Sequence, residues 1–187
     1  MDVLCVDKTG TLTGDKITLE YYMDVLGNEC QYALDLAYLN SLYHTGVQNH
    51  LDDAILRYRE MPGQEKHYEE LVQQHPKLDE LPFDHERKFA SILVRYGEKN
   101  LLIVKGSVDE VCQTCSYIEH KGKRYRSDTH VHASVHAIVD EMLEDGMKVL
   151  AVAYKPMEQE TISPEEETDL ILLGYLAFFD APKQSRH

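Results

Sequence analysis

Apolar residues recur along the first half of the chain at helical spacing. This spacing predicts helices over residues 29–44 and 50–60. The break at Met61-Pro62-Gly63 ends the second helix, because proline and glycine both disfavour its continuation. A more polar helix is predicted over residues 65–74. The first half is therefore predicted to be mainly helical, with the third helix exposed.

Apolar runs in the second half predict strands. Residues 89–96 and 100–105 form a predicted hairpin around Gly97-Glu98-Lys99, and residues 117–126 form a second one. The other predicted elements are a short helix over 107–115, with Ser107 as N-cap and Glu110 in a capping box, a helix over 128–144, and strands over 147–154 and 170–179. Hairpins interleaved with helices indicate an α+β fold with an antiparallel sheet flanked by helices.

Composition narrows the function classes. The 187 residues carry a formal net charge of −14, which disfavours nucleic acid and anionic membrane surfaces as partners. No apolar run approaches the roughly 20 residues that span a bilayer, and Met1-Asp2 lacks the basic start of a signal peptide. Four cysteines without framework spacing suit a reducing compartment. We therefore expect a soluble, cytoplasmic chain, in which the acidic run 165–167 is a solvated loop or helix start.

The clearest chemical signal lies near the start of the chain. The apolar run Val3–Val6 predicts a buried parallel strand, and Asp7 follows at its carboxyl end, where open α/β sheets place ligands. A carboxylate there can attack a phosphoryl group, Lys8 can offset phosphate charge, and Thr9 offers a hydroxyl. The alternative is an ordinary strand-to-loop turn with an exposed aspartate.

The segment Asp7-Lys8-Thr9-Gly10-Thr11-Leu12-Thr13 resembles, residue for residue, the phosphorylation motif of the P-type cation-transporting ATPases. The resemblance implies that Asp7 is the phosphorylated nucleophile, aided by Lys8 and Thr9. It also implies that Asp7 and Thr9 hold Mg²⁺ in the intact protein.

Residues 176–183 resemble the hinge through which this family returns to its phosphorylation domain, although Ala181 stands where the first proline is expected. The resemblance thus implies three parts. Residues 1–15 are a phosphorylation-domain strand and loop of the haloacid-dehalogenase-like α/β type, 16–175 a nucleotide-binding domain, and 176–187 the return hinge.

Several motifs of the intact family are missing from this sequence. It has no Thr-Gly-Asp, no Gly-Asp-Gly-x-Asn-Asp and no Thr-Gly-Glu segment. We therefore expect a fragment that is inactive alone. Its partners are ATP and the remaining phosphorylation, actuator and transmembrane domains of one polypeptide in the cell membrane.

Two segments resemble the nucleotide-binding motifs of the family. Pro82–Lys88 matches its Phe-x-x-x-Arg-Lys segment, which implies that Phe83 stacks on adenine and that Lys88 lies near the ribose or phosphates. Val104–Ser107 matches its Lys-Gly-Ala segment, so that Lys105 and Gly106 would form the pocket floor. On residue pattern alone, Phe83 could instead be a core residue and Lys105 an ordinary strand-end lysine.

Two further nucleotide contacts follow from the resemblance. Asp52 lines up with an acidic residue that accepts a hydrogen bond from the adenine amino group, although Asp52 or Asp53 could instead cap the following helix. Gly146–Leu150 resembles a Gly-x-Arg segment that reaches the phosphates, with Lys148 in place of arginine.

The branch of the family is indicated by four segments together. These segments resemble the magnesium-translocating ATPases of bacteria, and they are residues 39–46, 52–54, 83–87 and 174–178. The implied activity is Mg²⁺ transport driven by ATP hydrolysis through an aspartyl-phosphate. There are three alternatives: transport of another cation such as calcium, a soluble nucleotide-binding sensor without phosphoryl transfer, and a phosphatase of the haloacid-dehalogenase-like superfamily.

Two residue pairs could bind metal or undergo redox chemistry. Cys112 and Cys115 form one Cys-x-x-Cys pair, and no second pair completes a zinc site. His132 and His136 are four residues apart in the predicted long helix and share one face, but no third ligand is evident. The histidine pair could bind Zn²⁺ or Ni²⁺ adventitiously, whereas neither pair is expected to have a physiological role.

Overall fold

The computed structural model describes residues 16–180, without the side chains of residues 129–132 and 134. The strands are β3 (Ile17–Asp24), β4 (Lys77–Leu81), β5 (Phe89–Tyr96), β6 (Lys99–Ser107), β7 (Cys115–His120), β8 (Lys123–Arg126), β9 (Lys148–Met157) and β10 (Leu170–Asp180). The helices are α1 (Gln31–Tyr43), α2 (His50–Leu56), α3 (Glu65–Gln74), α4 (Val108–Gln113) and α5 (Thr129–Glu144), with 3₁₀ turns η2 (Arg57–Glu60) and η3 (Pro164–Glu166).

The eight described strands form one sheet in the order β4-β5-β6-β9-β10-β7-β8, and β3 also pairs with β10. Every pair is antiparallel except β7 with β10, so the sheet is mixed instead of wholly antiparallel as predicted. The parallel pair arises because helix α4 carries the chain from β6 across to β7, and a helical crossover returns a strand in the same direction. The predicted α+β class is confirmed.

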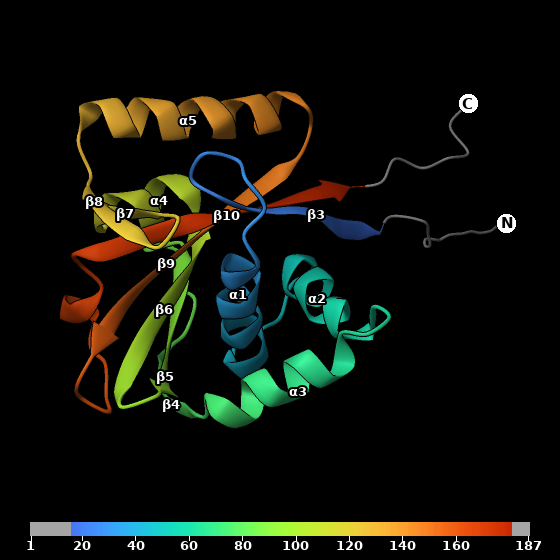
Figure 1. Ribbon diagram of the computed structural model, residues 1–187, viewed down its shortest axis with the longest axis vertical. Coiled ribbons are helices and arrows are strands. Elements are labelled where there is room, and N and C mark those ends of the chain that lie inside the picture. The colour runs from blue at the N-terminus through green and yellow to red at the C-terminus, as the bar shows by residue number, and fades with distance from the viewer. Residues whose placement is uncertain (1–15, 181–187) are drawn as a thin grey trace, which may run out of the picture.

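Helices cover both faces of the sheet, with α1, α2 and α3 on one side and α4 and α5 on the other (Figure 1). Successive residues of one strand enter opposite cores, because side chains alternate across a strand. Leu102 and Val104 pack under α4 and α5, whereas Leu101 and Ile103 pack under α1. Burial on both faces explains why the central strands are apolar at almost every position.

Two strands, β3 and β4, were not predicted from the sequence. Strand β3 mixes apolar and charged residues, and β4 is a five-residue edge strand with two acidic side chains. The predicted second helix is also divided, because α2 ends at Leu56 and η2 continues it as a tighter turn. Ser107 does hold the N-cap position of α4, but its side chain makes no capping hydrogen bond.

The two ends of the described chain lie side by side. In the antiparallel β3–β10 pair, Ile17 is the register partner of Asp180 (Figure 1). The predicted strand Val3–Val6, the segment Asp7–Thr13 and residues 181–187 lie outside the described residues. Within residues 16–180, no helix is long and apolar enough to cross a membrane.

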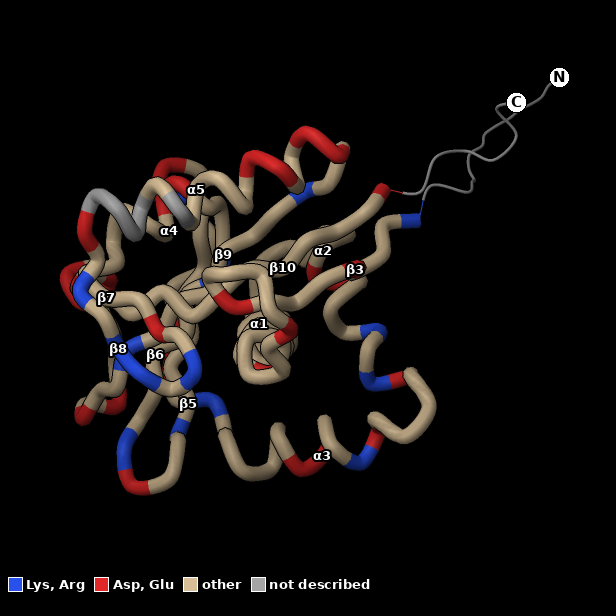
Figure 2. Tube along the Cα trace, turned by 45° about the horizontal axis from the view of Figure 1, so that its top comes forward, with Lys and Arg blue, Asp and Glu red and all other residues tan. Residues whose placement is uncertain are grey.

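Charged residues are distributed unevenly along the described chain. Acidic side chains occur on most elements, whereas β8 carries the basic group Lys123, Arg124 and Arg126 (Figure 2). Because the whole sequence carries a net charge of −14, its long-range field repels anions. Binding of an anionic ligand would therefore depend on cationic side chains close to its binding site.

Candidate functional site

A cavity of about 790 Å³ opens beside the carboxyl-terminal end of α1, within the size range of small-molecule sites. Its wall is built from the end of α1, the loop into α2, the β4–β5 loop and the adjoining ends of β5, β6 and β9. Five predicted nucleotide residues line it, namely Asp52, Phe83, Lys88, Lys105 and Gly106. The sixth, Lys148, is exposed and does not line it, although Val149 and Leu150 do.

An ion pair lies on the floor of this cavity. The Lys105 ammonium donates to Oδ1 of Asp52 at 2.9 Å, and the two side chains are 8% and 6% exposed. Burial alone would raise the pKa of Asp52, but the Lys105 charge and the hydrogen bonds from Lys105, Ser41 and Asn49 lower it below its usual value. The Asp52 carboxylate is therefore ionised at neutral pH.

The capping interpretation of this segment needs correction. Asn49 is the N-cap of α2 and accepts the Asp52 N–H at 2.8 Å, while the Asp52 carboxylate accepts the Asn49 N–H in return. Asp52 is thus the third helical residue of a capping box, and Asp53 is exposed. One carboxylate completes the helix start and fixes Lys105.

Phe83 lies on the cavity rim and not in the core, because it is 47% exposed. Its ring meets His85 edge to face, with 5.4 Å between ring centroids. Its backbone N–H donates to Nε2 of His44 at 3.3 Å, which ties the rim to the end of α1. An exposed aromatic face beside a cavity is a suitable stacking surface for a planar ligand.

Lys88 is held in an uncommon backbone conformation, with a φ of 64°. Its N–H donates to the Asp84 carbonyl at 2.6 Å, and its own carbonyl accepts the Ser107 N–H at 3.0 Å. Its ammonium is 4.0 Å from Glu110 and more than half exposed. The charge is therefore available at the cavity mouth.

Gly106 permits the close approach of the Lys88 loop to strand β6. A Cβ at this position would lie 2.4 Å from the Lys88 carbonyl oxygen and 2.4 Å from Cβ of Phe89. Only glycine fits without moving backbone.

Asn40 and His44 also line the cavity, and neither was among the predicted site residues. The Asn40 amide donates to the carbonyls of Ala90 and Ile103 at 3.1 and 3.0 Å, which joins α1 to β5 and β6. Polar residues on an otherwise apolar helix face were the sequence signal that could have identified Asn40 and His44. The role of these residues is evident only from the contact between helix α1 and the sheet.

The other residues with predicted chemical roles fall into two groups, those outside and those inside the described part of the chain. Asp7, Lys8 and Thr9 lie outside the described residues. Cys112 and Cys115 are free thiols, and burial raises the pKa of Cys112 to about 11 and also raises that of Cys115. The side chain of His132 is not described, and the described residues contain no cluster of three or more His, Cys, Asp or Glu able to hold a metal ion.

Comparison with known proteins identifies what the chain resembles. A family model described as "P-type ATPase, cytoplasmic domain N" matches residues 15–185. The chain is 39% identical over 188 residues to "Magnesium-transporting ATPase, P-type 1" of Escherichia coli K12, covering 99% of this chain and 20% of that protein. The protein of the same name from Salmonella typhimurium 14028s is 38% identical over 188 residues, with the same coverage.

A calcium-transporting ATPase of Listeria monocytogenes is 28% identical over 203 residues, covering 98% of this chain and 23% of that protein. The chain therefore spans about a fifth of the length of the curated relatives that it matches.

Proposed function

The chain belongs to the P-type ATPases as their cytoplasmic N domain, and we propose that it binds ATP in the cavity beside Phe83. The observation that carries this proposal is the gathering of five motif residues from three separate segments on one cavity wall. Such convergence of polar groups on an aromatic, partly apolar cavity is typical of a nucleotide site.

The adenine base would stack on the exposed ring of Phe83, which is worth about 1–3 kcal/mol. Lys105 would contact the base or ribose from the floor. Asp52 has Oδ1 occupied by Ser41 and Lys105, so its Oδ2 is the oxygen with capacity for the adenine amino group. Base binding therefore uses a polar floor that the fold has already assembled.

The phosphates would extend past the exposed ammonium of Lys88, toward the mouth of the cavity. Lys148 begins β9 next to the lining residue Val149 and could reach an extended phosphate chain. With few local cations against a net charge of −14, we expect weak binding, with a Kd of roughly 0.1–5 mM.

In the intact protein, a carboxylate oxygen of Asp7 would attack the γ-phosphorus of ATP. The new bond joins this carboxylate oxygen to the phosphorus and gives an acyl phosphate. The bond between that phosphorus and the bridging oxygen of ADP breaks, and ADP leaves. Lys8 and Thr9 would position the phosphoryl group, with Mg²⁺ held near Asp7 and Thr9 to offset its charge. The adjacent ends Ile17 and Asp180 suit a domain inserted into the one that carries Asp7.

Magnesium is the proposed transported ion, because the magnesium-transporting relatives are 38–39% identical and the calcium-transporting relative 28%. The domain would face the cytoplasm of a membrane-embedded transporter. A nucleotide sensor without phosphoryl transfer is the second candidate.

The proposal is tested by titrating ATP into the ¹⁵N-labelled chain and following amide resonances. Shifts should concentrate at Phe83, Lys88, Lys105 and Gly106. No saturable shifts, or shifts confined to residues far from the cavity, would refute it. GTP at the same concentrations measures base preference.

A further inference from the structure

The loop that carries Phe83 and Lys88 is closed by one guanidinium group. Nη2 of Arg87 donates to the Pro82 carbonyl at 3.3 Å and to the Phe89 carbonyl at 3.4 Å, which lie on either side of the loop. Nη1 lies 3.5 Å from Oδ2 of Asp84. The Arg87 side chain therefore joins the two ends of the loop and one residue within it.

Glu167 holds this guanidinium from a distant part of the chain. Nη2 of Arg87 donates to Oε2 of Glu167 at 3.0 Å, and Nε lies 2.9 Å from Oε1 as a second close charge contact. The Ser91 hydroxyl donates to the same carboxylate. The Glu167 side chain is 3% exposed and that of Arg87 is 23% exposed.

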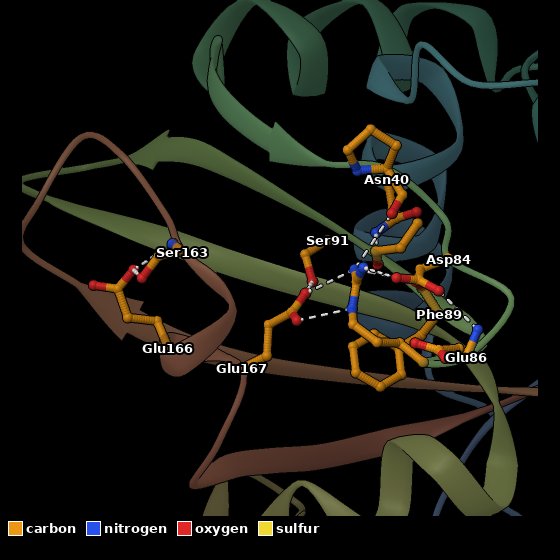
Figure 3. Close-up of polar contacts among 11 residues, drawn as sticks. Asn40, Asp84, Glu86, Phe89, Ser91, Ser163, Glu166 and Glu167 are labelled. Atoms are coloured by element: carbon orange, nitrogen blue, oxygen red, sulfur yellow. Dashed lines mark hydrogen bonds and ion pairs between the residues drawn. The ribbon is translucent and has the colours of Figure 1, made fainter.

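The prediction of a solvated acidic run at 165–167 is thus wrong for Glu167. Figure 3 shows Glu166 turned toward Ser163, while Glu167 points toward Ser91. Only the packing of this segment against β5 separates the two neighbouring carboxylates. A buried carboxylate is retained at a cost in desolvation, and replacing such a pair by apolar residues often leaves stability unchanged.

We propose that Arg87 and Glu167 are positioning residues that hold Phe83 and Lys88 in place for the nucleotide, without touching it. Neither residue lines the cavity, whereas Phe83, His85 and Lys88 of the loop that Arg87 closes do. Lys88 adopts its φ of 64° at the end of this loop, directly after Arg87. This inference rests on the proposed ATP site and identifies what sets its affinity.

The first test measures ATP affinity by NMR in E167Q, with E165Q as the matched control, because Glu165 carries the same charge two residues away and is exposed. E167Q should weaken ATP binding about 3–10-fold, and E165Q less than twofold. If E167Q does not fold, R87M/E167L replaces the pair with apolar side chains and should show the same weakening. Unchanged affinity in either folded variant overturns the proposal.

A double-mutant cycle separates positioning from general destabilisation. If the pair acts through the Phe83 ring, E167Q should weaken binding less than twofold in an F83A background. Full additivity of the two changes would contradict action through Phe83.

Hydrogen exchange supplies a readout that needs no nucleotide. The Lys88 amide, bonded to the Asp84 carbonyl, should exchange at least tenfold faster in E167Q. The Arg95 amide, bonded to the Pro76 carbonyl at the far end of β5, should be unchanged. Equal acceleration at both amides would mean a merely structural role. If the unmodified chain fails to bind ATP, the proposed function falls, and this experiment still decides whether the pair orders the loop.

Discussion

The Lys105 ammonium lies 2.9 Å from Oδ1 of Asp52, and both side chains are almost completely buried on the cavity floor. The pair joins β6 to the start of α2, two elements that are 53 residues apart at this contact. Breaking it from one side leaves a buried charge, so the cavity and the stability of the fold are coupled through this contact.

Asp52→Asn should destabilise the domain by about 3–5 kcal/mol at pH 7, because Lys105 loses its buried partner. Asp53→Asn, which changes an exposed neighbour, should cost less than about 0.5 kcal/mol. Urea unfolding of the two variants measures both values. Equal stabilities would contradict a strong ion pair.

The contribution of Asp52 should depend on pH in one direction. Its pKa is lowered on folding, so its stabilisation is complete above the unfolded pKa of about 3.9 and is lost as pH falls through the lower folded pKa. The stability difference between the unmodified chain and Asp52→Asn should therefore shrink below about pH 4. Urea unfolding at pH 7, 4 and 3 tests this, and a constant difference would contradict it.

Phe83→Ala should weaken ATP binding by about 1–3 kcal/mol through lost stacking, with little loss of stability, because the ring is 47% exposed. Tyr125→Ala is the matched control, since Tyr125 is 48% exposed on β8 and does not line the cavity. NMR titrations of both variants supply the Kd values. An unchanged Kd in Phe83→Ala would remove Phe83 from the site.

Gly106→Ala should destabilise the domain by about 1–3 kcal/mol, because its Cβ would force the Lys88 loop away from β6. It should also weaken ATP binding, since Lys88 would move. Ser107→Ala is the neighbouring control and should change stability by less than about 0.5 kcal/mol, because Ser107 makes no side-chain capping bond. Thermal unfolding followed by circular dichroism compares the two.

Cys112 should resist alkylation in the folded state. Burial raises its pKa to about 11, so its thiolate population at pH 8 is far smaller than that of an exposed thiol. Iodoacetamide labelling with peptide mass spectrometry, in buffer and in urea, measures the difference. Rapid labelling in buffer would mean that the thiol is more accessible or more acidic than the structure indicates.

Asp7→Asn should abolish the acid-stable, hydroxylamine-sensitive label that the intact transporter is expected to acquire from γ-labelled ATP. ATP binding should persist, because the substitution leaves the proposed base-binding residues of the cavity wall unchanged. The 187-residue chain alone should acquire no such label, since the motifs that hold the metal and align the phosphate are absent from its sequence. A label on this chain that is lost in Asp7→Asn would contradict that expectation.

The sequence by itself determined the elements whose spacing is regular. The β5–β6 hairpin, α1 and β10 were predicted from their apolar residues, because burial against the rest of the fold requires such residues, and α3 was predicted as a polar helix. Phe83, Lys88, Lys105 and Asp52 were predicted as site residues from local motifs, and the fold places them on one cavity wall. Local motifs carry this information because each occupies one short stretch of chain.

Only the tertiary structure decided which distant residues meet. The edge strand β4 carries no periodic signal, since it is half-buried and short. Nothing in the run 165–167 distinguishes Glu167 from its neighbours, yet packing against β5 buries it beside Arg87, 80 residues away. Asn40 likewise gains its role only where α1 meets β5 and β6. Burial and long-range pairing are properties of the assembled fold, and one-dimensional spacing does not encode them.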